Sequence, residues 1–334
     1  FDMVTVAEPE SYKTIASVCG NTMDFDAATK YVAKNIKTVF TGTPGADVIL
    51  SNASEASTSA VNALLKAGKT VGMVTEGEYK GDFICSYADF LTVKDAYILS
   101  ATGISGTVNA QVISKSPTVY VPGEATENPS GFRYSNQVSS VANWNYDQAA
   151  MKLMNFDTTD DVTKADAAAG ASALEADAKA AVQNGLPYIG YGSRATVDVI
   201  PGVTRTTLSG AMDCLTPVVY PNESLVNASY IADNDGILYG YGLGYFSAIP
   251  ENATILVQSD PTRTPTEGFI PTNTAQRAAG YAAYCNGSVQ AFAYTADGLD
   301  VVLFANSLTH KVQQRDDYAY ISNFLFSTVL SRSE

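Results

Sequence analysis

Leu186-Pro187-Tyr188-Ile189-Gly190-Tyr191-Gly192-Ser193-Arg194 is the stretch that decides the fold. Its apolar and aromatic centre, preceded by the turn pair Asn184-Gly185, predicts a buried strand that ends in a tight glycine turn. The Ala-rich run 164–183 before it predicts a helix on propensity alone. Open α/β sheets bind ligands beyond the carboxyl ends of their strands. We therefore expect Ser193, just past the turn, to lie at such an edge.

Two strand–helix series surround this stretch. The first starts at Asp47–Leu50, passes through a helix that Gly68 ends, and returns at Val71–Val74, so we expect these two strands to pair in parallel. From about residue 200, short strands separated by Asn, Gly and Pro predict an antiparallel set, and an amphipathic helix closes the chain. The sequence therefore predicts a small α/β domain over residues 1–112 and a larger α/β domain over residues 113–334.

Composition excludes several classes of function. The 334 residues carry a formal charge of −14, which argues against nucleic acid as a partner. No apolar run reaches the ~18 residues of a membrane span. The single histidine, His310, cannot supply the two or three imidazoles of a usual zinc site, and the four scattered cysteines form no Cys-x-x-Cys pair. We therefore expect no metal and no cofactor; the cysteines could be two disulfides or four thiols.

The surface composition favours an exported protein. The chain is rich in Asn, Thr, Ser and Tyr and poor in Lys, and it opens on Phe1 rather than Met, which we read as a processed or excised segment. Asn-x-Ser/Thr triplets fit export, although such triplets often arise by chance. They begin at Asn52, Asn222, Asn227, Asn252 and Asn286. We expect an extracellular or cell-surface location.

The order of several segments carries a resemblance to a known family. The segments are the strand Thr118–Gly123, the Ala-rich run into Leu186–Gly192, the strand Val301–Ser307 ahead of His310, and the closing helix. In this order they resemble the class I glutamine-amidotransferase-like domain, versions of which are appended to secreted zinc carboxypeptidases. The segment 60–68, followed by Gly81-Asp82-Phe83, is similar to the region that precedes this domain in the same carboxypeptidases. The resemblance implies a flavodoxin-like sheet over residues 113–334.

The departures from the family pattern bear on function. Active members place a Cys nucleophile on the strained turn, within Gly-x-Cys-x-Gly, whereas the matching residue here is Gly192. A glycine has no side chain that can attack a carbonyl. The family's His-x-Glu pair is absent, and the His-x-x-Glu of the carboxypeptidases cannot be built from His310 alone. The resemblance thus implies the fold without either catalytic site.

Three residues are candidates for a binding site. Ser193 and His310 are the one pair that could support nucleophilic catalysis, but Gly-Ser-Arg-Ala is not the Gly-x-Ser-x-Gly elbow. The ordinary alternative, which we favour, is that Ser193 caps a helix after the turn and His310 lies in a surface loop. Arg194 at that helix start would reinforce an anion site, and its ordinary alternative is an ion pair.

Two further patterns have structural explanations that we prefer. The stretch Ile237–Phe246 alternates glycine with aromatic residues, and its tyrosines could stack on a sugar or peptide or pack between strands. The acidic residues around Asp161 lack the spacing of a calcium loop, so we expect a solvated loop.

The sequence leaves three functions open. We expect first a non-catalytic accessory or binding region, attached to a peptidase domain of a zinc carboxypeptidase-like or cell-surface protein. The alternatives are a hydrolase that uses Ser193 and His310, and a carbohydrate- or peptide-binding module. A small anionic ligand, a peptide or a glycan are the partners considered.

Overall fold

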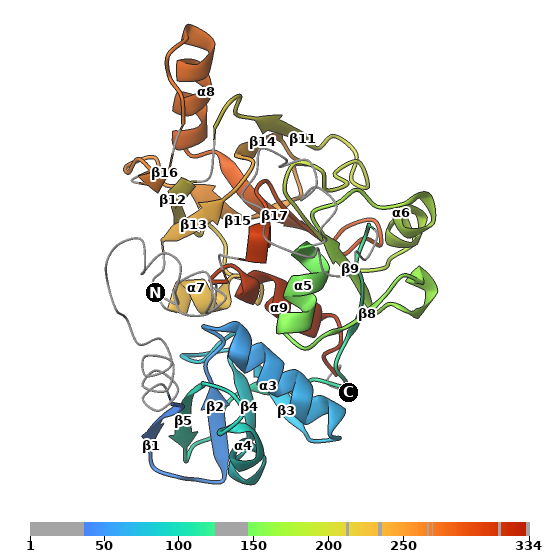
Figure 1. Cartoon of the computed structure of the whole chain (residues 1–334), viewed down its shortest axis with the longest axis vertical. Helices are drawn as coiled ribbons and strands as arrows, with labels where there is room; N and C mark the ends of the chain where they lie inside the picture. Colours follow the sequence, from blue (N-terminus) through green and yellow to red (C-terminus); the bar gives the residue numbers. More distant parts are fainter. Residues whose placement is uncertain are drawn as a thin grey trace, which may run out of the picture.

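The computed structural model contains two β-sheets, one of six strands and one of twelve, with helices packed around and between them (Figure 1). It describes residues 37–123, 146–211, 214–232, 236–265, 267–268, 270–312 and 315–331. Both sheets combine parallel and antiparallel strands. The predicted α/β class is therefore confirmed, with one sheet formed by residues before 113 and the other by residues after 117.

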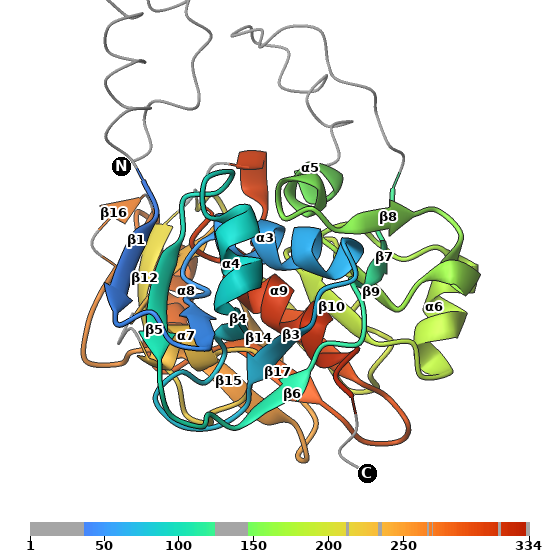
Figure 2. The same cartoon turned by 90° about the horizontal axis from the view of Figure 1, so that it is seen from below.

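The six-stranded sheet has the order β1-β5-β2-β4-β3-β6. Its elements are β1 (Val39–Gly42), β2 (Asp47–Leu50), α3 (Glu55–Lys66), β3 (Val71–Val74), β4 (Phe83–Ser86), α4 (Tyr87–Val93), β5 (Ser100–Ile104) and β6 (Ala110–Val112). The run from β2 to β5 is a βαββαβ unit whose four strands lie in the order fourth, first, third, second. This is the split βαβ, or ferredoxin-like, arrangement. In Figure 2 the molecule is viewed from the end at which this sheet lies.

The expected direct pairing of β2 with β3 is wrong. The two strands run parallel, but β4 lies between them and pairs antiparallel with both. The connection from β3 to β4 is short and closes as a hairpin, with the Val74 N–H donating to the Asp82 carbonyl at 2.9 Å and the Gly81 N–H to the Val74 carbonyl at 3.0 Å. The crossover from β2 to β3 leaves room for one strand between them. Because β4 follows β3 directly in the chain, it pairs with β3 as a hairpin and lies in this position.

The twelve-stranded sheet is parallel on one side and antiparallel on the other. Its elements are β7 (Thr118–Tyr120), α5 (Tyr146–Leu153), β8 (Asp157–Thr159), η2 (Val162–Lys164), β9 (Ala167–Gly170), α6 (Ala176–Gln183), β10 (Tyr188–Tyr191), β11 (Thr204–Thr207), β12 (Cys214–Val219), α7 (Ala228–Ala232), β13 (Ile237–Gly240), β14 (Gly244–Ala248), β15 (Thr254–Ser259), β16 (Glu267–Gly268), α8 (Ala275–Cys285), β17 (Val289–Tyr294), β18 (Val301–Phe304), η3 (His310–Val312) and α9 (Tyr318–Ser327). The parallel strands β8-β7-β9-β10-β18 have the flavodoxin-like order 2-1-3-4-5. The strands β17, β15, β12 and β13 continue the sheet in antiparallel fashion, as predicted for the second half.

The Ala-rich run 164–183 is not one helix. Ala167–Gly170 form β9, a strand in the middle of the parallel sheet, and only residues 176–183 form α6. All four residues of β9 are buried between β7 and β10. A Cβ on Gly170 would lie 2.8 Å from the Cδ of Pro122, so the space admits only very small side chains. Helix propensity is a weak preference that tertiary packing overrides.

The closing helix α9 is buried on all sides rather than amphipathic. Every residue from Tyr318 to Phe326 is buried, because the helix lies between the two sheets (Figure 1). Phe326 packs against Phe83 of the first sheet at a ring-centroid distance of 5.2 Å, and against Phe156 of the second half at 5.3 Å. One apolar core therefore contains side chains from both sheets. The boundary near residue 112 separates the sheets but does not separate their cores.

Buried amides join the two halves across the same interface. The Asn52 Nδ2 donates to the Asn323 Oδ1 of α9 at 2.7 Å, and the Asn323 Nδ2 donates to the Ser229 Oγ at 3.2 Å. Asn52 and Asn227 are both buried, so these two triplets are structural and cannot accept a glycan. The triplets at Asn222, Asn252 and Asn286 lie at exposed positions.

Candidate functional site

The strand β10 ends in the tight turn that the sequence predicts. Tyr188–Tyr191 are buried, and Gly192 follows with a φ of +92°, a left-handed conformation that favours glycine. Its N–H donates to the Phe304 carbonyl at 3.1 Å. A Cβ at this position would lie 3.4 Å from the backbone of Ser307. The turn that follows β10 therefore has no side chain at its first position.

Ser193 and Arg194 follow the turn and are exposed to solvent. The expectation that Ser193 caps a helix, with Arg194 at the helix start, is wrong because residues 192–203 form turns without a helix. Thr196 holds this segment against the core instead: its N–H donates to the Tyr188 hydroxyl at 3.2 Å, and its Oγ1 accepts from the Leu174 N–H at 2.7 Å. Among the described residues, the N–H groups of Ser193 and Arg194 have no acceptor, and the Arg194 guanidinium has no ion-pair partner.

His310 lies at the same edge of the sheet as Ser193. The strands β10 and β18 are parallel neighbours, with Tyr191 opposite Phe304, so their carboxyl ends leave the sheet side by side. His310 begins the 3-10 turn η3 six residues after β18 and is half-buried. Between them, Asn306 is buried and accepts from the Gly244 N–H at 2.9 Å.

A strap of five residues, Gly240–Gly244, crosses this edge and connects β13 to β14. We call it the glycine strap. Tyr241 at its centre stacks on the His310 ring, with centroids 3.3 Å apart and an interplanar angle of 7°. Gly242 has a φ of +71°, and a Cβ there would lie 3.9 Å from the Ser193 hydroxyl. The strap therefore contacts His310 and passes near Ser193, and Tyr241 is 40% exposed rather than packed between strands.

The buried carboxyl group of Asp147 forms hydrogen bonds with segments that end at this edge. Asp147 accepts from the Thr309 hydroxyl at 2.5 Å and from the Ala171 N–H, at the end of β9, at 2.8 Å. Burial raises the pKa of Asp147, while these hydrogen bonds oppose the rise. In a flavodoxin-like sheet, ligands bind where the strand order reverses, which here is between β7 and β9. Asp147 lies at this point, within 3.1 Å of a Cβ on Gly170, and occupies it.

Among the described residues, the groups at this edge are not joined into a serine–histidine pair. Within the described chain, no hydrogen bond joins Ser193 to His310, so Ser193 has no general base in this geometry. The Asp147 carboxyl group is engaged by Thr309 and Ala171. No three His, Cys, Asp or Glu side chains converge as metal ligands anywhere in the described ranges. What the edge presents is a hydroxyl, a guanidinium, two backbone N–H groups and an aromatic stack.

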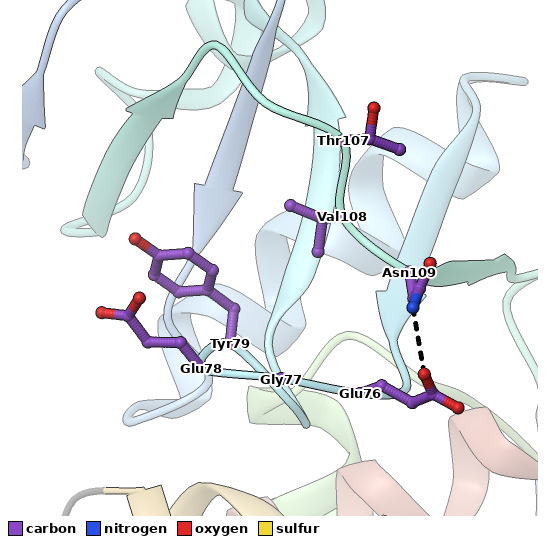
Figure 3. Close-up of a pocket in the computed structure, with 7 residues that line it drawn as sticks. All are labelled: Glu76, Gly77, Glu78, Tyr79, Thr107, Val108 and Asn109. Atoms are coloured by element: carbon purple, nitrogen blue, oxygen red, sulfur yellow. Dashed lines mark hydrogen bonds between the residues drawn. The ribbon is translucent and has the colours of Figure 1, made fainter.

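Two hollows lie elsewhere on the molecule. One, of about 390 Å³, is formed by the loops after β3 and β5 and is shown in Figure 3. It is lined by Glu76, Gly77, Glu78, Tyr79, Thr107, Val108 and Asn109. Asn109 donates to Glu76 at 3.0 Å, and both glutamates are exposed. The other, of about 400 Å³, lies at the start of α8 beside Arg277. Neither contains a residue that the sequence indicated for function.

The acidic loop and the cysteines have structural explanations. Asp157, Asp161 and Asp166 pair with Lys66, Lys164 and Lys115 respectively, at 2.6 to 2.9 Å. Cys85, Cys214 and Cys285 are thiols, with no disulfide between any two of them. Burial raises the pKa of Cys85 to about 12, which makes this thiol inert. In the described residues, no helix is both long enough and apolar enough to cross a bilayer.

The chain matches no family model, and no curated protein is similar to it in sequence. Among solved structures, it is similar to a "putative GMP synthase" protein from Thermoplasma acidophilum, at 12% identity and a TM-score of 0.37, over 63% of this chain and 92% of that chain. It is also similar to an exo-β-1,4-mannosidase from an Opitutaceae bacterium, at 8% identity and a TM-score of 0.34, over 66% of this chain and 37% of that chain.

The sequence indicates Ser193, Arg194 and His310 as candidates but does not indicate the residues that lie around them. Asp147 and the pairing of Tyr241 with His310 were not predicted. The sequence contains one indication of the pairing of Tyr241 with His310: the glycines at 240, 242 and 244 allow the strap to approach other groups closely. A Cβ on Gly240 would lie 3.1 Å from the Asn306 side chain, and one on Gly244 would lie 2.5 Å from Arg205.

Proposed function

We propose that this chain is a non-catalytic binding region whose ligand site is the carboxyl edge of β10 and β18. The observation that carries the proposal is Gly192: the turn is present, but its side chain is missing, while Ser193 and Arg194 beyond it stay exposed. Within the part of the chain that the structure describes, two N–H groups have no acceptor and one guanidinium has no counter-ion, which favours a negatively charged group with two oxygens. The ligand is therefore one that carries a carboxylate.

The exposed ring of Tyr241 suggests what kind of molecule carries this carboxylate. Gly242 of the strap lies beside Ser193, so a ligand held at Ser193 and Arg194 can extend over Tyr241. Aromatic faces stack on sugar rings and on peptide side chains alike. Peptides with a free carboxyl terminus and acidic glycans are the two sources to compare.

We further propose that the chain is an accessory region of a secreted zinc carboxypeptidase-like or cell-surface protein. The order of segments and the Lys-poor composition support this assignment. Sequencing the parent gene and fractionating its cells tests it. A His-x-x-Glu motif upstream, with export of the product, agrees with the proposal; a cytosolic product without such a motif contradicts it.

Binding is tested on arrays that pair each peptide with its amidated form, and each acidic glycan with its neutral analogue. We expect binding that needs the free carboxylate and weakens roughly 10- to 100-fold in Arg194→Gln, since a charged hydrogen bond contributes about 1.5–3 kcal/mol. Arg277→Gln, at the start of α8, is the matched control and should bind as the parent does. Equal binding of free and amidated probes, or no effect of Arg194→Gln, would count against the site.

Catalysis is tested with glutamine, peptide and ester substrates, with and without zinc. We expect no turnover by the parent chain or by Ser193→Ala and His310→Ala, since Ser193 lacks a base. Turnover that either substitution abolishes would establish the hydrolase alternative in place of the binding region.

A further inference from the structure

Arg205 in β11 reaches both loops that build the candidate site. Its Nε donates to the Ala305 carbonyl at 2.6 Å, at the end of β18, and its Nη2 donates to the Gly242 carbonyl of the glycine strap at 2.6 Å. A third donor, Nη1, reaches Thr207 Oγ1 within the same strand at 2.7 Å. One planar guanidinium thus connects the segment that leads to His310 with the strap that carries Tyr241.

The contacts of Arg205 indicate that it is kept for the geometry of its hydrogen bonds rather than for its charge. The partners that hold it are neutral oxygens, and none of the described ion pairs includes it. Burial lowers the pKa of Arg205, so keeping a charge here works against stability. A Cβ on Gly244 would lie 2.5 Å from its Nη2, which means that the strap has a glycine where the guanidinium passes.

We propose that Arg205 is the positioning residue of the Tyr241–His310 stack, and hence of the aromatic part of the ligand surface. This inference rests on the proposed function for its biological meaning, but its structural content can be tested without a ligand. A lysine cannot replace the arginine, because a single ammonium group cannot reach both carbonyls in the plane that the fork of N–H groups spans. With Arg205 removed, the Ser307 N–H still donates to the Tyr241 carbonyl and the Gly244 N–H to Asn306. The strap loses only its bond at the Gly242 carbonyl, so we expect Tyr241 to lie less closely on the imidazole.

The single histidine makes the stack directly measurable. The proton NMR signals of the His310 ring report the ring current of Tyr241, which lies flat against it at 3.3 Å. We expect these signals at high field in the parent chain and at the unstacked position in Tyr241→Leu, which serves as the reference. Arg205→Lys and Arg205→Met should both shift them part of the way toward that reference, because the bonds of the strap to Asn306 and Ser307 remain. Thr207→Val, which removes the one bond that leads to neither loop, should leave them in place.

The outcome that overturns the proposal is a His310 signal that stays at high field in an Arg205 variant. Melting temperatures are recorded alongside; if Arg205→Met does not fold, Arg205→Lys decides, and Gly244→Ala, which displaces the guanidinium, gives a second reading. The carboxylate arrays are then repeated with Arg205→Lys, for which loss of the preference for ring-bearing probes is expected. A parent chain that binds no array probe refutes the proposed function, while the His310 signals still decide the role of Arg205.

Discussion

At the scale of single residues, Gly192 and Asp147 account for most of what the site can and cannot do. Gly192 offers no side chain at the turn after β10, and Asp147 accepts from the Ala171 N–H at the point of the sheet where the strand order reverses. Ser193 and Arg194 stay exposed because Thr196, two residues further on, anchors the segment to the core through Tyr188 and Leu174. Each residue can be probed by one substitution.

Gly192→Ala should destabilise the protein by about 1–2 kcal/mol, because its φ of +92° is unfavourable for any residue with a Cβ. Gly68→Ala is the matched comparison: its φ is +73°, and a Cβ there meets nothing within 4 Å. Chemical denaturation measures both. A Gly192→Ala protein as stable as the parent would show that the turn relaxes into another conformation.

Asp147→Asn should make the stability of the protein less dependent on pH. The pKa of Asp147 is raised by burial, so the folded state binds more protons than the unfolded state, whose Asp has a pKa of about 3.9. The contribution of this carboxyl group to stability is therefore present near pH 4 and is lost as the pH rises through the folded-state pKa.

The asparagine variant can accept from the Ala171 N–H through its carbonyl oxygen and donate to the Thr309 hydroxyl through its Nδ2, as a protonated carboxyl group does. Its stability should therefore be close to that of the parent near pH 4 and should exceed it increasingly as the pH rises and the parent ionises. Urea unfolding between pH 4 and pH 8 measures the difference, with the exposed Asp157→Asn as control. A parent that gains stability relative to the variant as the pH rises would show that the carboxylate form stabilises the fold.

At the scale of elements, local pattern predicted some segments and failed on others for identifiable reasons. β10, β18 and α5 follow from apolar runs or helical spacing bounded by turns or polar residues. β9 was read as helix because four small residues carry no strand signal, and only their burial between two strands makes them one. The sequence shows the glycine strap as a pattern, but the residues near it, Ser193 and His310, lie 49 residues from Gly242 and 69 residues from Tyr241 in the chain.

The helix α8 projects from the molecule (Figure 1), with only Tyr284 of its residues buried. Gly280 lies in its interior, and a Cβ there would meet only Leu208, at 3.9 Å. Gly280→Ala should therefore stabilise the helix by about 0.5–1 kcal/mol. Hydrogen exchange of the α8 amides should slow accordingly. Gly72→Ala in β3 is the contrasting change: a Cβ there would lie 2.9 Å from Ile84, so that variant should lose stability.

At the scale of the whole molecule, α9 packs between two topologically separate sheets, and we expect them to unfold together. Phe326→Ala should cost about 3–5 kcal/mol, since it opens a cavity between Phe83 and Phe156. Because these partners belong to the two halves, hydrogen exchange in β2 and in β18 should accelerate together. Leu91→Ala, at a side chain that is 43% exposed, should change either rate little. Acceleration confined to one sheet would mean that the halves unfold independently.

The sequence by itself determined the α/β class, the place of the turn at Gly192 and the solitary histidine, because these depend on local pattern and residue identity. It assigned the strand before His310 to the antiparallel set, whereas β18 pairs in parallel with β10, and this pairing brings Ser193 and His310 to one edge. Only the tertiary structure decided that Tyr241 lies on His310, that Asp147 fills the reversal point, and that α9 is buried between the sheets. These contacts depend on which strands become neighbours, and that order is set by the burial of the whole chain rather than by any segment of it.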